Sequence, residues 1–366
     1  MRVAMVVPGG VDASGEERVI PALVWLIERL ARRHDVHVFA LQQEREPAEW
    51  TLRGAVVHNI GTVGARRARF LGRFADAQRG GPFDLVHAVF GGTGVLALAA
   101  GVRHGLPVLL HLAGGELVRM PEIGYGSRST LRGRVGNLVA MRGARRVTVA
   151  TPYMQRLARR LGVQASLVPL GVALDRWPAL PPRARVAGRR PVLLHIGDLR
   201  PVKDQAMLLE AARLLRERGV DFELHIAGLD TAAGALQRSD AARALEGDVH
   251  WHGLLGRTAL RRLVERADLL LMTSRHEAGP LAVLEAAVAG VPTVGTAVGH
   301  VDELAPDAAV AVPVGDAAAL AREVAALLGD EPRRLALAHA AQRHATAYDA
   351  ELTAARFEWL YEELLP

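Results

Sequence analysis

Residues 269–288 read LLLMTSRHEAGPLAVLEAAV, and this stretch decides the fold class. An apolar run ends at Met272, a polar segment follows, and Pro280 then precedes a run of Ala, Val and Leu. A short apolar run between turn signals is typical of a buried strand, and proline suits a helix start, where its missing N–H has no partner anyway. The stretch therefore predicts a strand, a loop and a helix, which is the repeating unit of parallel sheets.

The same alternation of apolar runs and helical stretches extends over almost the whole chain. An amphipathic helix is predicted at 19–32, and a proline-rich break at 178–191 divides the series of strands in two. We therefore predict an α/β protein with two Rossmann-like, doubly wound parallel-sheet domains, residues 1–172 and 191–347, joined by a linker at 173–190. A helical C-terminal segment, 348–366, is grouped with the first domain, although its pattern does not specify where it packs. The predicted strands are 3–7, 36–40, 56–59, 85–89, 108–111 and 147–149, then 192–196, 222–227, 249–252, 269–272, 293–296 and 309–312.

Composition excludes several classes of protein. The chain has 366 residues, half of them apolar and 23% charged, which is typical of a folded protein rather than a disordered one. It has no cysteine, so disulfides, thiolate metal sites and a cysteine nucleophile are excluded. Metal-binding motifs such as H-E-x-x-H and the G-x-S-x-G motif of serine hydrolases are absent, and we expect no metal. No apolar stretch reaches the roughly 20 residues that span a bilayer, and the run at 3–7 is too short for a secretory signal, so we expect a cytoplasmic protein.

Charge is distributed unevenly along the sequence. Residues 1–180 contain 24 arginines, no lysine and 13 acidic residues, whereas the remainder is net acidic. Such a field attracts an anionic surface, lipid or polymer, and a peripheral contact with the inner face of the membrane is one use of it. A solvated arginine-rich face is the alternative. Nucleic acid is disfavoured, because aromatic residues make up only 4% of the chain.

Two turns of the second half contain the best candidate site residues. Glu277 lies in the loop after strand 269–272, and Glu285 is the only charged residue between Gly279 and Gly299. A carboxylate among apolar residues needs hydrogen bonds, from ligand hydroxyls or, in a structural role, from backbone N–H groups. Lys203, the only lysine of the chain, follows strand 192–196, with Arg200 three residues before it. A compact cation at a turn between strand and helix suits a phosphate, although an exposed cation at a helix start has the same pattern.

The first half offers weaker candidates. The glycine-rich turn at 8–18 contains Gly15, where the backbone can approach a ligand closely, but Ser14 and Glu17 also fit an ordinary helix entry. His111 closes a predicted strand. Residues 92–97 match G-x-G-x-x-A, with Glu116 about 20 residues later, so a nicotinamide-dependent oxidoreductase is a distant alternative.

Taken together, these motifs resemble the family 4 glycosyltransferases, which are retaining, nucleotide-sugar-dependent enzymes with the GT-B fold. The resemblance rests on the E-x7-E spacing of Glu277 and Glu285, on residues 197–203, on the glycine-rich first turn and on VPLGVALD at 168–175. It covers nearly the whole chain, and it is most specific in residues 274–303. It implies two domains that face each other across a cleft.

The resemblance also implies roles for individual residues. Glu277 matches the acid that faces the donor sugar, Glu285 the acid that holds the ribose, and Lys203 the lysine on the donor diphosphate. Arg200 is expected to replace the family arginine, because this chain has Asp198 at that position. The remaining positions implied are Gly279, Leu281 and Ala282 at the diphosphate, Gly253 at the base, His111 near the sugar and Gly15 in the first turn.

The implied function is metal-independent transfer of a hexose to a hydroxyl acceptor, which is a lipid, a polysaccharide precursor or a small metabolite. No cofactor is expected beyond the nucleotide-sugar co-substrate. Two alternatives use the same fold and the same donor motif. They are a nucleotide-sugar epimerase and a sugar-nucleotide-binding protein without turnover.

Overall fold

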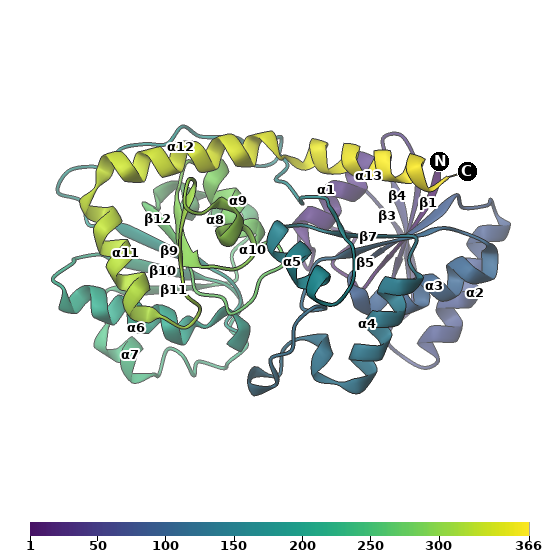
Figure 1. Cartoon of the computed structure of the whole chain (residues 1–366), viewed down its shortest axis with the longest axis horizontal. Coiled ribbons are helices and arrows are strands. Elements are labelled where there is room, and N and C mark those ends of the chain that lie inside the picture. Colours follow the sequence, from purple (N-terminus) through teal and green to yellow (C-terminus); the bar gives the residue numbers. More distant parts are fainter. Residues whose placement is uncertain (366) are drawn as a thin grey trace. The chain divides into compact units, whose positions relative to one another are not determined.

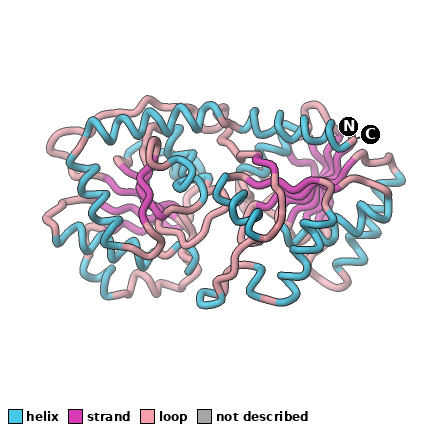
Figure 2. The backbone as a smooth tube through the Cα atoms, in the orientation of Figure 1, coloured by secondary structure: helices cyan, strands magenta, loops and turns pink. Residues whose placement is uncertain are grey.

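The computed structural model describes residues 1–365, which form two compact units. Unit 1 comprises residues 1–171 and the C-terminal segment from Ala350, and unit 2 comprises Val172–Asp349. The last residue of the expected segment 348–366 lies outside the described residues. Figures 1 and 2 show a sheet flanked by helices in each unit. None of the helices in residues 1–365 has the length and apolar content needed to span a membrane.

The sheet of unit 1 has eight strands in the order β3-β4-β2-β1-β5-β6-β7-β8. All neighbours are parallel except β3 and β4, which pair antiparallel. Strands β3 and β8 were not predicted, because β3 is a largely exposed edge strand and β8 has only two residues. The strands are β1 (Arg2–Val7), β2 (Asp35–Ala40), β3 (Ala48–Leu52), β4 (Ala55–Asn59), β5 (Leu85–Val89), β6 (Val108–Leu112), β7 (Arg146–Val149) and β8 (Ser166–Leu167).

The first helix begins later than its sequence pattern predicts. Helix α1 starts at Pro21, whereas Ser14 lies in a closed turn, where its Oγ accepts the N–H of Glu17 at 3.0 Å. The S-x-x-E pattern therefore marks a loop and not the helix start. The other helices between the strands of unit 1 are α2 (Arg66–Arg79), α3 (Gly91–His104), α4 (Leu131–Gly143) and α5 (Pro152–Arg160).

The C-terminal helix α13 (Ala350–Leu364) completes the core of unit 1. It lies beside α1 (Pro21–Leu30), and the side chains of Phe357 and Tyr361 are fully buried. Thr353 Oγ1 donates to the carbonyl of Pro169 at 2.7 Å and accepts the N–H of Gly171 at 2.9 Å. The end of the chain therefore belongs structurally to its beginning (Figure 1).

The sheet of unit 2 is fully parallel, with the order β11-β10-β9-β12-β13-β14. If β9 is counted as strand 1 and β14 as strand 6, this is the 3-2-1-4-5-6 order of dinucleotide-binding folds. The direction of winding reverses between β9 and β12, and in such sheets ligands bind at the carboxyl ends of the strands at this position. The strands are β9 (Val192–Ile196), β10 (Glu223–Ala227), β11 (Val249–Gly253), β12 (Leu269–Met272), β13 (Thr293–Thr296) and β14 (Ala309–Val312).

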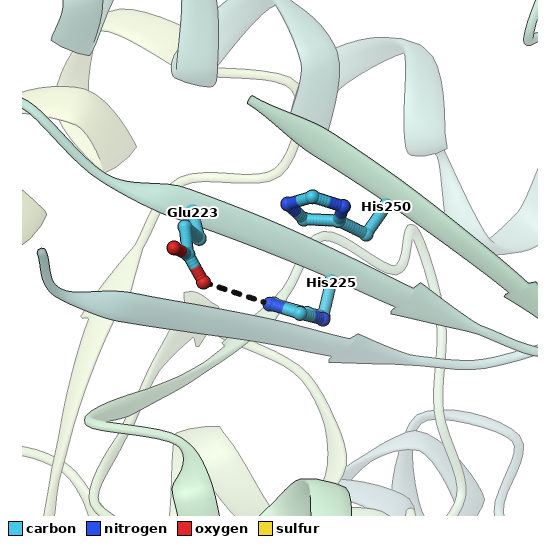
Figure 3. Close-up of side chains that lie close together, drawn as sticks. All are labelled: Glu223, His225 and His250. Carbon is cyan, nitrogen blue, oxygen red and sulfur yellow. Dashed lines mark hydrogen bonds and ion pairs between the residues drawn. The ribbon is translucent and has the colours of Figure 1, made fainter. Parts of the chain in front are cut away.

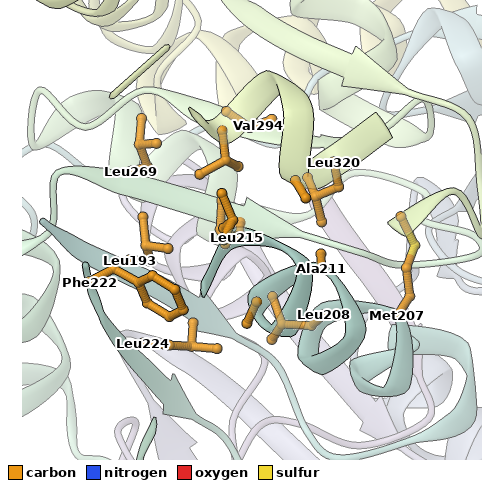
Figure 4. Close-up of a cluster of buried hydrophobic side chains, with 14 of the residues drawn as sticks. Leu193, Met207, Leu208, Ala211, Leu215, Phe222, Leu224, Leu269, Val294 and Leu320 are labelled. Atoms are coloured by element: carbon orange, nitrogen blue, oxygen red, sulfur yellow. The ribbon is translucent and has the colours of Figure 1, made fainter. Parts of the chain in front are cut away.

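Helices of unit 2 pack on both faces of this sheet, and a buried apolar cluster on one face is drawn in Figure 4. Leu193, Leu224 and Leu269 of the strands meet Leu208 and Leu215 of helix α6 there. The helices are α6 (Gln205–Glu217), α7 (Asp240–Ala244), α8 (Arg257–Arg266), α9 (Leu281–Val288), α10 (Gly299–Leu304), α11 (Ala317–Gly329) and α12 (Glu331–Ala347).

The segment expected to be a linker, 173–190, is packed against unit 2. Trp177 is buried, and its Nε1 donates to the carbonyl of Glu285 at 2.9 Å. The N–H of Leu180 donates to the carbonyl of Val288 at 3.1 Å. These contacts, and the start of unit 2 at Val172, make the segment part of unit 2.

Candidate functional site

The loops after β9 and β12 are fixed to each other at the point where the winding of unit 2 reverses. The N–H of Arg275 donates to the carbonyl of Val202 at 2.8 Å, and Thr273 Oγ1 donates to the carbonyl of Lys203 at 2.8 Å. A third link joins Arg275 Nε to Asp204 Oδ2 at 2.7 Å. Two segments about 70 residues apart in the sequence thus form one rigid edge.

Lys203 and Glu277 meet at this edge. Lys203 Nζ lies 2.5 Å from Glu277 Oε1, and Ser274 Oγ donates to the same oxygen at 2.6 Å. The side chain of Lys203 is 26% exposed, so its ammonium has hydrogens left for a ligand. The pair offers a phosphate a cation and offers a hydroxyl group the second oxygen of Glu277.

Glu285 is enclosed without a partner. The residue is 8% exposed, and no hydrogen bond to its carboxylate exists within the described chain. Burial raises the pKa of Glu285 to about 7, because water no longer solvates the charged form. The side chain is therefore a hydrogen-bond acceptor that a ligand can satisfy.

The N-terminus of α9 adds backbone donors. The N–H groups of Leu281 and Ala282 have no acceptor among residues 1–365, as is usual for the first turn of a helix. Gly279 precedes them in the loop, and Pro280 supplies no N–H. Gly299 adopts a φ of +55°, and a Cβ there would lie 2.7 Å from Pro280 and 2.9 Å from Glu277, so a larger residue would displace this loop.

Asp198, at the position of the usual family arginine, has a structural contact. Its Oδ1 accepts the N–H of Leu229 at 3.1 Å, which ties the loop after β10 to the loop after β9. Gly228 makes this approach possible, because a Cβ there would lie 2.0 Å from the carbonyl oxygen of Gly197. Arg200 is exposed, and no described residue pairs with its guanidinium, so it is available to a ligand. Gly253 is the last residue of β11, and its carbonyl accepts the N–H of Gly228 at 2.9 Å.

Sequence reasoning missed the polar residues beneath this edge. His195 is 1% exposed, with Nδ1 at 3.0 Å from the carbonyl of Leu271 and Nε2 at 3.2 Å from Gln205 Nε2. Burial lowers the pKa of His195 to about 4, so its ring is neutral near pH 7. Gln205 also donates to the carbonyl of Asp198 at 2.9 Å, and so supports the loop that ends at Lys203. Nothing in the sequence pattern distinguishes these residues from other polar ones.

Gly15 and His111 belong to unit 1, whereas the residues described above belong to unit 2. Gly15 has a φ of +67°, and its N–H donates to Asp12 at 2.9 Å within the closed first turn. His111 is 1% exposed, and its Nδ1 lies 2.9 Å from Thr148 Oγ1. Its ring packs edge-on against Phe357 of α13, and burial lowers the pKa of His111 to about 3. The ring therefore lies beneath α13, and its buried Nε2 has no hydrogen-bond partner among the described residues. The expected place of His111 near the donor sugar stays a prediction.

The dinucleotide alternative requires a free N-terminus on α3, and Glu116 occupies it. Glu116 Oε1 accepts the N–H of Gly91, the first residue of α3, at 2.9 Å, and Oε2 accepts the N–H of Gly114 at 2.8 Å. A carboxylate thus lies where a pyrophosphate would have to bind.

Comparisons with known proteins agree with this architecture. The family described as "Glycosyl transferases group 1" matches residues 179–344, and "Glycosyl transferase 4-like domain" matches residues 19–171. The chain belongs to the glycosyltransferases of the family 4 type. The resemblance seen in the sequence is thereby confirmed.

Relatives of this glycosyltransferase span most of its length. The D-inositol 3-phosphate glycosyltransferase of Arthrobacter sp. (strain FB24) is 26% identical over 95% of this chain and 90% of its own. Sucrose-phosphate synthase from Thermosynechococcus elongatus has a TM-score of 0.81 at 18% identity, over 100% of this chain and 99% of its own. Anabaena HepE, solved in complex with UDP-glucose, has a TM-score of 0.77 at 16% identity, over 99% of this chain and 100% of its own. The two solved structures confirm the expected GT-B fold.

Proposed function

We propose that this glycosyltransferase moves a hexose from a nucleoside-diphosphate sugar to a hydroxyl acceptor, with retention of anomeric configuration. The observation that supports a donor site is the contact between Lys203 and Glu277 at the reversal point of unit 2, beside the free N-terminus of α9. The complex of HepE with UDP-glucose favours a uridine nucleotide.

In the proposed donor site, different residues of unit 2 bind different parts of the nucleotide sugar. Lys203, Arg200 and the N–H groups of Leu281 and Ala282 bind the diphosphate, Glu277 orients the sugar hydroxyls, and Glu285 accepts hydrogen bonds from the ribose. The glycine turn at Gly253 borders the base. Each of the diphosphate, sugar and ribose roles uses a group that is charged or lacks a protein partner among the described residues.

Departure of the diphosphate is the step that these groups assist. Cleavage of the glycosyl–phosphate bond leaves positive charge on the sugar and negative charge on the leaving phosphate. Fixed cations and helix N–H groups stabilise that phosphate without reorganisation. The acceptor hydroxyl attacks from the face that the phosphate leaves and gives its proton to the phosphate. No residue of this site requires a metal, and we expect transfer to continue in EDTA.

The acceptor is proposed to be a hydroxyl compound with a negative charge. The Arthrobacter relative is named for D-inositol 3-phosphate, and residues 1–180 of this chain hold 24 arginines against 13 acidic residues. A phosphorylated polyol and an anionic lipid or glycan precursor share the chemistry that such a field attracts.

A surface on α4 of unit 1 favours the lipid. Leu131, Val135 and Val139 lie along one row of this helix and are 73%, 53% and 50% exposed. A hollow of about 300 Å³ adjoins Leu131 and Val135. Four arginines without an acidic partner among the described residues surround the row: Arg128, Arg132, Arg134 and Arg142. Apolar side chains ringed by free cations suit an anionic membrane, and we propose peripheral contact there.

The donor proposal is tested by titrating nucleotide sugars calorimetrically into the wild-type protein and two variants. Lys203→Ala and Glu285→Ala each remove a partner of a desolvated ligand group and are expected to weaken donor binding by about 2–4 kcal/mol. Glu246→Ala is the matched control, because Glu246 is exposed and its side chain has no described contact. Unchanged affinity in both site variants would refute the assignment.

Turnover distinguishes the three functions that share this fold. Release of nucleotide that depends on an added acceptor identifies transfer. Isomerisation of the sugar without an acceptor identifies an epimerase, and tight donor binding without turnover identifies a binding protein.

A further inference from the structure

Three side chains with metal-ligating atoms gather at one edge of the sheet of unit 2. They are Glu223 and His225 of β10 and His250 of β11, drawn in Figure 3. His225 and His250 are paired across the two strands, and Glu223 lies two residues before His225, on the same face of β10. Their candidate ligand atoms all lie within 4.8 Å of one another.

The distance between Glu223 and His225 suits two ligands of one metal ion better than a direct hydrogen bond between the two side chains. Zinc bonds to imidazole nitrogen and carboxylate oxygen are about 2.0–2.2 Å long, so two ligands of one tetrahedral ion lie about 3.3 Å apart. Glu223 Oε2 and His225 Nε2 are 3.4 Å apart, which is long for a hydrogen bond between them.

We propose that Glu223, His225 and His250 bind one Zn²⁺ ion, or a similar divalent transition-metal ion. Two imidazoles and one carboxylate are a common ligand set for such ions. His225 is buried and His250 is exposed, so the ion reaches the site from solvent and keeps a water in its open position. This site does not depend on the proposed donor site.

His252 of β11 supports His225 as a ligand. Its Nε2 lies 2.8 Å from His225 Nδ1, and the two rings stack with centroids 5.1 Å apart. A metal-bound histidine normally uses its second ring nitrogen in such a hydrogen bond, which fixes the orientation of the ring.

The site lies away from the proposed donor contacts. Glu223 is the first residue of β10, whereas the loop that contacts Gly197 follows the end of that strand. Its bound ion would link β10 to β11, the strand at the edge of the sheet. The inferred role is therefore stabilisation of this edge and not sugar transfer.

The test uses the full-length protein without an affinity tag, freed of metal by EDTA and then dialysed. Calorimetric titration with ZnSO4 is expected to give one saturable site per chain, and His250→Ala is expected to weaken it at least tenfold. Because His250 is exposed, that variant folds without loss of core packing. His339→Ala is the matched control, since His339 is exposed and lies on α12, outside the cluster.

Two further readouts separate a built site from general histidine binding. Saturating Zn²⁺ raises the melting temperature of the wild type and of His339→Ala, and this rise is lost in His250→Ala and in Glu223→Gln. Co²⁺ in place of Zn²⁺ gives a visible d–d absorption band that both cluster variants lose. Zinc binding of equal strength and number in wild type and His250→Ala, or no saturable binding, overturns the proposal.

Discussion

Glu285 links the proposed site to the stability of unit 2. Its pKa is about 7 in the folded protein, against 4.5 for an unperturbed glutamate. Between pH 4.5 and pH 7 the carboxyl group of Glu285 is ionised in the unfolded chain but still protonated in the folded chain. The free energy of unfolding therefore falls as pH rises from 4.5 to 7, by about 3 kcal/mol in total at roughly 1.4 kcal/mol per pH unit.

Glu285→Gln is expected to remove this pH dependence. Without ligand, the variant should gain about 2–3 kcal/mol over wild type between pH 4.5 and pH 8, because glutamine has no charge to bury. Urea denaturation followed by circular dichroism at both pH values measures the difference. Glu246→Gln, at an exposed position, should follow the wild-type profile. Parallel profiles for Glu285→Gln and wild type would contradict the assigned cause.

For single residues, the sequence predicted whether a side chain is buried better than it predicted which side chain it contacts. The enclosure of Glu285 follows from its Ala, Val and Leu neighbours, and the structure confirms it. The contact between Lys203 and Glu277 joins two loops 74 residues apart, and it depends on a strand order that a local pattern does not specify. His225 and His250 were not predicted as a pair for the same reason. They are neighbours only because of the register in which β10 pairs with β11.

Helix α13 is the element on which unit 1 most clearly depends. The ring of Phe357 is fully buried and lies 4.6 Å from that of His87, between centroids. The same helix also forms ion pairs, of Glu351 with the buried Arg29 at 2.9 Å and of Glu358 with the exposed Arg33 at 3.1 Å. The helix therefore joins unit 1 through both apolar packing and charge.

Phe357→Ala is expected to destabilise unit 1 by about 3–5 kcal/mol, the usual cost of truncating a buried aromatic side chain. Trp359→Ala on the same helix should change the free energy of unfolding by less than about 0.5 kcal/mol, because Trp359 is 57% exposed. Chemical denaturation of both variants measures the two effects. Equal values would show that α13 does not pack as described.

Elements were predicted where their apolar pattern was complete. The strands of unit 2 agree with the pattern to within a residue or so. The pattern is clearest in β12 (LLLM) and β14 (AVAV), because a largely buried parallel strand appears as an uninterrupted apolar run. Strand β3 has no such run, since Glu49 and Thr51 face solvent at the edge. The placement of α13 was left open because an amphipathic pattern shows which face is buried and not what covers it.

At the scale of the whole molecule, the uneven charge has a structural counterpart in two arginine groups of unit 1. On α2, Arg73 pairs with Glu49 and Arg79 with Asp76. On α4, by contrast, Arg132 and Arg134 are exposed without an acidic partner in the described chain. Free cations beside exposed apolar residues should determine membrane contact, whereas paired ones should not.

Arg132→Gln/Arg134→Gln is therefore expected to weaken binding to phosphatidylglycerol vesicles at low salt by tenfold or more, at about 1 kcal/mol per basic residue near the surface. The matched control Arg73→Gln/Arg79→Gln removes the same charge from paired positions and should bind nearly as wild type does. Vesicle flotation measures the bound fraction.

High salt should release the wild type, since salt screens surface charge within about 10 Å. Purely zwitterionic vesicles should not bind it, because they have no net negative charge. If the two double variants lose binding equally, net charge governs attachment and the surface of α4 has no special part in it. If the wild type does not float with anionic vesicles at low salt, the proposed membrane contact fails.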